Sequence, residues 1–265
     1  AKGMYKSLSD AEFASCARTL ECFRTGSRCR CKISMQGNGK TGDGREKERV
    51  EMAKELILIG AGKFARETVW MLERLQRENA CPWKLLGYVD DTDEKQGTEV
   101  YGYPVLGKTD LLLDWPSDVW AIMPMGSSQG RRGLDARLSG ASGLHWATLQ
   151  SHSAVIGKGF MAGEGCLLCE QTLCTVDVHL GRHTIINVGS TISHDTVLGD
   201  FVTVSPGVTV CGNCRIGDGV FLGAGATVIE QIQIGPGVVV GAGATVVKDL
   251  IEPGVYVGTP ARRIH

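Results

Sequence analysis

The sequence predicts an α/β domain followed by a parallel β solenoid with three flat sides. Three observations lead to this fold class. Strand-like and helix-like segments alternate over residues 53–148. Apolar residues then recur at every sixth position from Ile156 to Val246. Glycine, with 36 of 265 residues, has about twice its average share, which suits a fold with many tight corners.

The first part of the chain differs from the rest. Residues 1–51 mix Lys, Arg, Ser and Gly with no sustained period, apart from a short helical pattern at 10–22. A segment of this composition buries little apolar surface. We therefore expect residues 1–52 to be an appended or poorly ordered segment, with the folded protein starting close to Met52.

Residues 53–148 predict a small Rossmann-like domain with a parallel sheet, because strands and helices alternate. The strands are expected at 55–59, 85–89 and 119–123, and the helices at 63–78 and near 131–138.

A glycine turn joins the first strand of this domain to the first helix. Gly60-Ala61-Gly62 has the arrangement that presents backbone amides to a phosphate. Ala65 stands where a dinucleotide site has its third glycine, so the turn is weak evidence for NAD.

The second half of the chain repeats every six residues. The positions of this frame hold Ile156, Ala162, Leu168, Cys174, Leu180, Ile186, Ile192, Leu198, Val204, Val210, Ile216, Leu222, Val228, Ile234, Val240 and Val246. The period fits one flat face plus one corner of a three-sided solenoid, with three hexads in each coil. Residues eighteen apart should therefore stack in successive coils, about 4.8 Å from each other.

Two further positions of the hexad tend to hold the same type of residue along the repeat. Four residues after the apolar one stands a small or β-branched residue, such as Thr184 or Val202, which is expected to fill the corner from inside. One residue after the apolar one, glycine recurs, as at Gly157 and Gly223. We expect this glycine to supply the positive φ of the bend.

Ten cysteines raise the alternatives of disulfides or zinc. Two Cys-x2-Cys pairs begin at Cys166 and Cys211, which are two and a half coils apart and so cannot share one metal. With no signal-peptide pattern in view, we expect reduced cysteines, no metal and a cytoplasmic location. A net charge of −1 gives no reason to expect nucleic acid or a membrane surface as a partner.

His194 is the candidate general base. It stands in the corner of its hexad and should project outward, and Asp195 follows it with a carboxylate that can orient the imidazole. Stacking places Gly212 of the next coil beside His194, which leaves room for a substrate. The alternative interpretation is a solvated His–Asp turn without a catalytic role.

Several segments together resemble a known family. They are the hexads, Gly-Ala-Gly-Lys-Phe-Ala-Arg-Glu at 60–67, Asn187 with His194-Asp195, and Gly-Thr-Pro-Ala at 258–261. They are similar to the hexapeptide-repeat sugar O- and N-acetyltransferases, typified by sialic acid O-acetyltransferase and the UDP-4-amino-sugar N-acetyltransferases. The resemblance covers about residues 54–265. It implies a left-handed β-helix over 149–250 with a cap over 251–265, acetyl-CoA as co-substrate, and a homotrimer with sites between subunits.

The resemblance also implies roles for single residues. His194 with Asp195 matches the family's catalytic histidine and acidic residue, and Asn187 matches an active-site asparagine. Acetyl-CoA is expected along the β-helix, against the backbone of Ala224 and Ala242.

One position departs from the family. A second histidine often follows the catalytic one after nine residues and contacts the acetyl group of the donor, but this chain has Thr203 there. Its hydroxyl can still donate a hydrogen bond to the donor.

In the family's amino-sugar enzymes, the glycine turn and a following acidic pair hold the nucleotide of the acceptor. The matching residues here are Gly62, Lys63, Phe64, Asp90 and Asp91. The family has a small polar or glycine-rich turn after the third strand, whereas this chain has Met-Pro-Met-Gly at 123–126.

The expected function is therefore acetyl transfer from acetyl-CoA to a sugar, with the amine of a nucleotide-linked amino sugar as the favoured acceptor. Two alternatives stay open. One is O-acetylation of sialic acid or serine, and the other is a non-enzymatic trimeric β-helix scaffold. A metal-dependent version of the scaffold lacks a third ligand beside His179 and His183.

Overall fold

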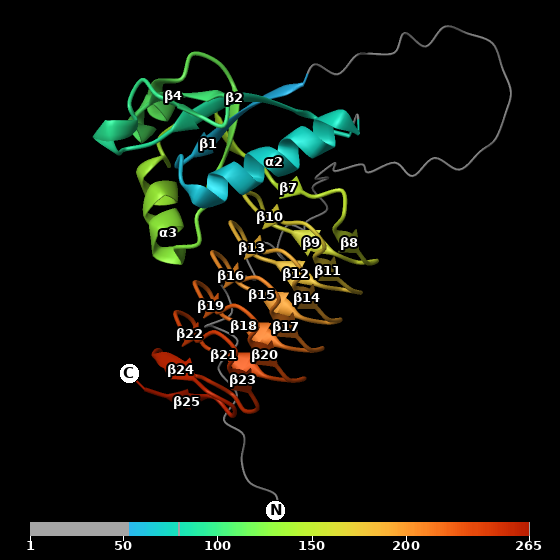
Figure 1. Cartoon of the computed structure of the whole chain (residues 1–265). Helices are drawn as coiled ribbons and strands as arrows, with labels where there is room; N and C mark the ends of the chain where they lie inside the picture. Colours follow the sequence, from blue (N-terminus) through green and yellow to red (C-terminus); the bar gives the residue numbers. More distant parts are fainter. Residues whose placement is uncertain (1–52, 79, 265) are drawn as a thin grey trace, which may run out of the picture. The chain divides into compact units, whose positions relative to one another are not determined.

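The computed structural model describes residues 53–78 and 80–264, which Figure 1 shows in colour. The expectation for residues 1–52 lies outside the described part of the chain. Within the described residues, no helix has the length and apolarity needed to cross a membrane.

A six-stranded sheet forms the first part, in the order β3-β4-β2-β1-β5-β6. All neighbouring strands run parallel except β3, which pairs antiparallel with β4. The elements are β1 (Lys54–Ile59), α2 (Lys63–Arg77), β2 (Trp83–Val89), η1 (Asp93–Lys95), β3 (Glu99–Val100), β4 (Tyr103–Gly107), η2 (Thr109–Asp114), β5 (Val119–Ile122), α3 (Ser128–Arg137) and β6 (Leu144–Trp146). The expected strands and helices are all present, and β3, β4 and β6 add to them.

β1 lies in the middle of the sheet, between β2 and β5. Its residues form an apolar run because both faces of the sheet are covered. On one face, Leu56 and Leu58 pack with Val69 and Leu72 of α2. This same cluster continues into Leu149, Leu167 and Ile185 of the second part, so α2 lies between the sheet and the β-helix, as Figure 1 shows.

The second part is a β-helix with three parallel sheets as its sides. The first side holds β7 (Leu149–Gln150), β10 (Leu167–Leu168), β13 (Ile185–Ile186), β16 (Thr203–Val204), β19 (Phe221–Leu222), β22 (Val239–Val240) and β24 (Val255–Val257), with β25 (Arg262–Arg263) added antiparallel at its end. The second side holds β8 (Val155–Ile156), β11 (Leu173–Cys174), β14 (Thr191–Ile192), β17 (Thr209–Val210), β20 (Thr227–Val228) and β23 (Thr245–Val246). The third side holds β9 (Met161–Ala162), β12 (His179–Leu180), β15 (Val197–Leu198), β18 (Arg215–Ile216) and β21 (Gln233–Ile234).

The register confirms the eighteen-residue coil, since Ile186 pairs with Val204 and Ile192 with Val210. Two corners matter for the site. We call the corner between the first and second sides the first corner; it carries Glu170, Val188, Pro206, Ala224 and Ala242. We call the corner between the second and third sides the second corner; it carries Val176, His194, Gly212 and Glu230.

The predicted interior is confirmed. The repeated apolar residues from Leu168 to Val246 are buried, and so are the small corner residues such as Thr184 and Val202. Ile156 is only half-buried and Ala162 is exposed; both belong to the first coil.

The role expected for the repeated glycines is wrong. The positive φ falls two residues later, at Gly225 (+66°) and at residues with side chains such as Asp195 (+57°). Gly157 and Gly223 are instead needed for close approach between coils. A Cβ at Gly157 would lie 2.4 Å from the Thr175 carbonyl oxygen, and one at Gly223 would lie 2.5 Å from the Ala242 nitrogen.

Arg131 of α3 ties the α/β part to the β-helix. Its side chain is buried, and Nε donates to the His183 carbonyl (3.0 Å) while Nη2 donates to the Phe201 carbonyl (2.8 Å). Nη1 donates to the Met125 carbonyl (2.6 Å). Burial lowers the pKa of Arg131 to about 10, so the guanidinium still carries its charge at neutral pH.

Candidate active site

The second corner displays His194 to solvent, as the repeat predicts. The His194 side chain is 64% exposed, and its Nδ1 lies 2.8 Å from Oδ2 of Asp195. A carboxylate only accepts hydrogen bonds, so Nδ1 carries the proton in the neutral ring and Nε2 keeps its lone pair. The pair therefore has the arrangement of a general base with an orienting carboxylate.

Gly212 lies beside the imidazole, again as the repeat predicts. A Cβ at Gly212 would come within 2.6 Å of both Cε1 and Nε2 of His194. The absence of a side chain at Gly212 thus keeps the basic nitrogen accessible.

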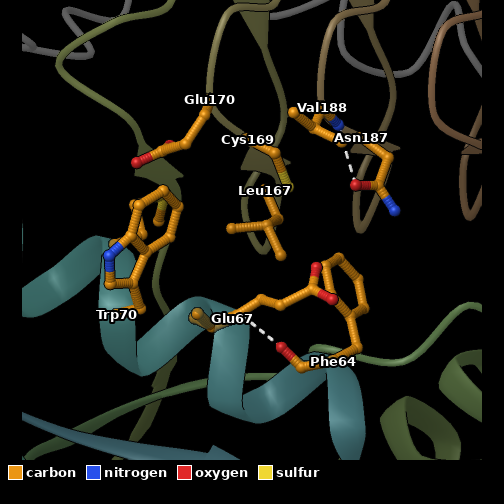
Figure 2. Close-up of a pocket in the computed structure, with 10 residues that line it drawn as sticks. Phe64, Glu67, Trp70, Leu167, Cys169, Glu170, Asn187 and Val188 are labelled. Carbon is orange, nitrogen blue, oxygen red and sulfur yellow. Dashed lines mark hydrogen bonds between the residues drawn. The ribbon is translucent and has the colours of Figure 1, made fainter.

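Asn187 belongs to the first corner and lines a pocket with Phe64 of α2 (Figure 2). Its Oδ1 accepts a hydrogen bond from the Val188 amide at 2.7 Å. The structure therefore brings together one residue expected in catalysis and one expected to hold the acceptor. His194 does not line this pocket.

Ala224 and Ala242 are exposed and stack in successive coils of the first corner. The Ala224 carbonyl accepts from the Gly243 amide at 2.8 Å, so the coils of this corner are held together by backbone hydrogen bonds. Asn187, Ala224 and Ala242 thus share one corner of the β-helix, whereas His194 and Asp195 occupy another.

Thr203 is enclosed. Its residue is 3% exposed, its hydroxyl donates to the Gly126 carbonyl at 2.9 Å, and it accepts from Nη2 of Arg131 at 3.0 Å. Both hydrogen bonds of the hydroxyl are made with groups of this chain. In this chain, the place of the family's second histidine therefore serves the junction with α3, and we assign it no contact with the donor.

The Asp90 carboxylate fixes the glycine turn by hydrogen bonds. Its Oδ2 accepts from the Ala61 amide (2.7 Å) and from Nζ of Lys95 (2.7 Å), and its Oδ1 accepts from the Thr92 amide (2.9 Å). Burial alone would raise the pKa of Asp90, but these hydrogen bonds outweigh it and lower the pKa to about 2. Asp90 is thus ionised at neutral pH, and its carboxylate positions the turn.

Asp91 is engaged on the other side of the turn region. Its Oδ1 accepts from the Thr109 amide (2.9 Å), and its Oδ2 pairs with Nη1 of Arg137 (2.6 Å). These bonds outweigh partial burial and lower the pKa of Asp91.

The start of α2 is open. Gly62 is the N-cap residue without a side-chain hydrogen bond, the first turn holds no acidic residue, and both Gly62 and Lys63 are exposed. Free amides and a cationic side chain at a helix N-terminus can accept an anionic group.

The cysteines are free wherever the structure describes them. In the same residues, no group of three or more His, Cys, Asp and Glu side chains could hold a metal ion. His183 is buried and its Nε2 lies 3.2 Å from Oδ1 of Asp135.

Two family models match the chain. Residues 55–138 match the PglD N-terminal domain, and residues 213–248 match the bacterial transferase hexapeptide (six repeats). No curated protein matches the chain in sequence.

Solved structures match over most of the chain. WeeI from Acinetobacter baumannii AYE is 31% identical with a TM-score of 0.70, and the match covers 80% of this chain and 100% of that one. The chain belongs to the hexapeptide-repeat sugar acetyltransferases.

Two further members of the family have been solved with ligands. The acetyltransferase domain of PglB from Neisseria gonorrhoeae FA1090, in complex with acetyl coenzyme A, is 28% identical with a TM-score of 0.70; the match covers 80% of this chain and 99% of that one. PerB from Caulobacter crescentus, in complex with CoA and GDP-perosamine, is 27% identical with a TM-score of 0.70; the match covers 80% of this chain and 97% of that one.

The chain is therefore an acetyltransferase with acetyl-CoA as its co-substrate. Its fold is an α/β domain followed by a left-handed β-helix, as predicted. The alternative of a non-enzymatic scaffold is wrong.

Proposed function

We propose that this acetyltransferase transfers the acetyl group to the amine of a nucleotide-linked amino sugar. The observation that carries the proposal is the exposed His194–Asp195 pair with its open Nε2. Support comes from a fold whose relative binds CoA together with GDP-perosamine.

The proposed chemistry is one proton transfer coupled to one acyl transfer. The amine nitrogen attacks the thioester carbon of acetyl-CoA, and Nε2 of His194 takes the amine proton as the C–N bond forms. The C–S bond then breaks, and CoA leaves as a thiolate that takes up the proton. Asp195 stabilises the imidazolium through the hydrogen bond to Nδ1.

The two corners suggest that the site needs more than one subunit. Asn187, Ala224 and Ala242 lie on the first corner and His194 on the second. We propose a homotrimer in which the first corner of one subunit, with its acetyl-CoA, faces the second corner of the next. In trimers mixed from His194→Ala subunits and Asn187→Ala subunits, some sites combine an intact Asn187 from one subunit with an intact His194 from the next. Such mixed trimers would then regain activity through these sites.

For the acceptor, we propose that its diphosphate lies at the open start of α2, against Gly62 and Lys63, with the sugar toward Phe64. Asp90 acts indirectly in this proposal, because its carboxylate fixes the turn that presents these residues. Asp91 and Arg137 hold the neighbouring loop in the same way.

The test is a thiol-release assay with acetyl-CoA and GDP- or UDP-linked 4-amino sugars, with sialic acid and serine as competing acceptors. We expect turnover of an amino sugar, and a loss of about 100-fold or more in kcat for His194→Ala, because general-base catalysis contributes that much. The variant should still bind acetyl-CoA in calorimetry.

His145→Ala is a matched control, since His145 is also exposed and paired with a carboxylate, Asp118, but lies in β6 of the α/β part. It should keep full activity. Unchanged turnover in His194→Ala would remove the proposed base, and acetylation of sialic acid or serine alone would replace the proposed acceptor.

A further inference from the structure

A pocket of about 250 Å³ lies between α2 and the second and third coils of the β-helix (Figure 2). Its walls are largely apolar, and Phe64 and Asn187 of the proposed site form part of them. The other lining residues are Glu67, Thr68, Trp70, Met71, Leu167, Cys169, Glu170 and Val188. The pocket therefore extends from the proposed acceptor site along α2.

Glu170 is the unusual residue of this pocket. It is 7% exposed; its Oε1 accepts a hydrogen bond from Nη1 of Arg74 at 3.2 Å, and its Oε2 is buried without any hydrogen-bond partner. A buried polar atom without a partner is costly, and native structures contain few of them. A ligand that donates a hydrogen bond to Oε2 would remove this cost.

The surroundings of Glu170 favour a neutral donor. Arg74 already balances the negative charge at 3.2 Å and also stacks on Trp70, with its guanidinium carbon 5.3 Å from the ring centroid. A second cation in this place would be repelled by Arg74. A hydroxyl group, by contrast, can satisfy Oε2 without adding charge.

The shape and the remaining walls fit a single sugar ring. Trp70 is 46% exposed and lies beside the carboxylate (Figure 2), so it offers an apolar aromatic surface for the C–H groups of a ring. Pockets for drug-sized ligands have about 300–1,000 Å³, so this smaller pocket suits one ring and not a whole nucleotide sugar.

We infer that Glu170 determines acceptor specificity by accepting a hydrogen bond from a ring hydroxyl of the sugar, while Trp70 packs against the ring. The inference rests on the proposed function and adds the class of sugar. The acceptor is an amino sugar that keeps a free hydroxyl, not a ring deoxygenated at that position.

The test compares acceptors in pairs. Thiol release is measured with GDP-perosamine or a UDP-4-amino-4,6-dideoxyhexose, whichever the wild type turns over faster, and with each ring-deoxy analogue of it. The wild type should lose at least about tenfold in kcat/KM on one analogue. Glu170→Ala should show the same loss in kcat/KM on the parent sugar, mainly through a higher KM. Its kcat/KM should fall no further when the analogue replaces the parent sugar.

Two more variants complete the design. Glu170→Gln keeps the packing and an acceptor oxygen, so it should retain part of the discrimination, and it carries the test if Glu170→Ala does not fold. Glu99→Ala removes an exposed carboxylate from β3, outside the lining of the pocket, and should discriminate between the analogues as the wild type does.

The outcomes separate the two proposals. If the wild type acetylates no nucleotide amino sugar, the proposed function fails and this inference falls with it. If the wild type acetylates one but tolerates every deoxy analogue, or if Glu170→Ala and Glu170→Gln discriminate like the wild type, only the role of Glu170 is wrong.

Discussion

At the scale of single residues, Gly212 controls access to the proposed base. In Gly212→Ala, the new methyl group would lie 2.6 Å from Cε1 and Nε2 of His194, so the imidazole must turn away. A displacement of about 1 Å in a catalytic group lowers the rate by about 100-fold. We expect a loss of this order in kcat, measured by thiol release, with the circular dichroism spectrum unchanged.

The backbone itself tolerates alanine at this place of the hexad. Ala224 occupies the corresponding place in the first corner, twelve residues further on. Gly133→Ala is a suitable control, because a Cβ at Gly133 in α3 meets no atom within 4 Å. Full activity in Gly212→Ala would show that the ring does not need its observed position.

At the scale of elements, the turn between β1 and α2 depends on an ionised Asp90. Its pKa in the folded protein is about 2, below the ordinary value of 3.8. The stabilisation by the ionised carboxylate is therefore complete at pH values above the ordinary pKa, and it is lost as the pH falls toward 2. We expect Asp90→Asn to lower the free energy of unfolding by about 2 kcal/mol at pH 7, measured by urea denaturation.

The difference between wild type and Asp90→Asn should shrink as the pH falls from about 4 to about 2, because the wild-type carboxylate then becomes protonated. Asp93→Asn serves as the comparison. Asp93 pairs with Lys108 on the surface, and such pairs contribute little. A pH-independent difference for Asp90→Asn would contradict the assignment.

At the scale of the whole described molecule, Arg131 makes the two parts depend on each other. Arg131→Met removes the hydrogen bonds to the carbonyls of His183 and Phe201 and leaves these acceptors unpaired. We expect a loss of about 3 kcal/mol in the free energy of unfolding. Urea denaturation followed by circular dichroism measures it, with Gln129→Met as control, because Gln129 is exposed on the same helix.

A loss of less than about 0.5 kcal/mol in Arg131→Met, within the range of an ordinary surface substitution, would show that Arg131 does not link the two parts energetically.

The period made much of this architecture predictable. Because every sixth side chain must point inward, the interior residues, the exposure of His194 and its contact with Gly212 all follow from counting. The glycine conformations did not follow, because the repeat fixes the hexad but not which residue of it takes the positive φ.

The contacts between the two parts could not be predicted from the six-residue period. Thr203 and Glu170 acquire their partners only when α3 and α2 pack against the β-helix. One usable signal was present in the sequence. Leu167 and Ile185 hold outward-facing places of the first side, where the second side has threonines such as Thr191, and the two apolar residues are buried under α2.

The stacked coils also set a rule for how the length of such a chain can change. Each coil returns to the same corner after eighteen residues, as the pairing of Thr191 with Thr209 shows. Inserting or deleting six or twelve residues between Asn187 and Ala224 would rotate everything downstream by one or two thirds of a turn. Only whole coils can be gained or lost without carrying the binding surfaces to a different side.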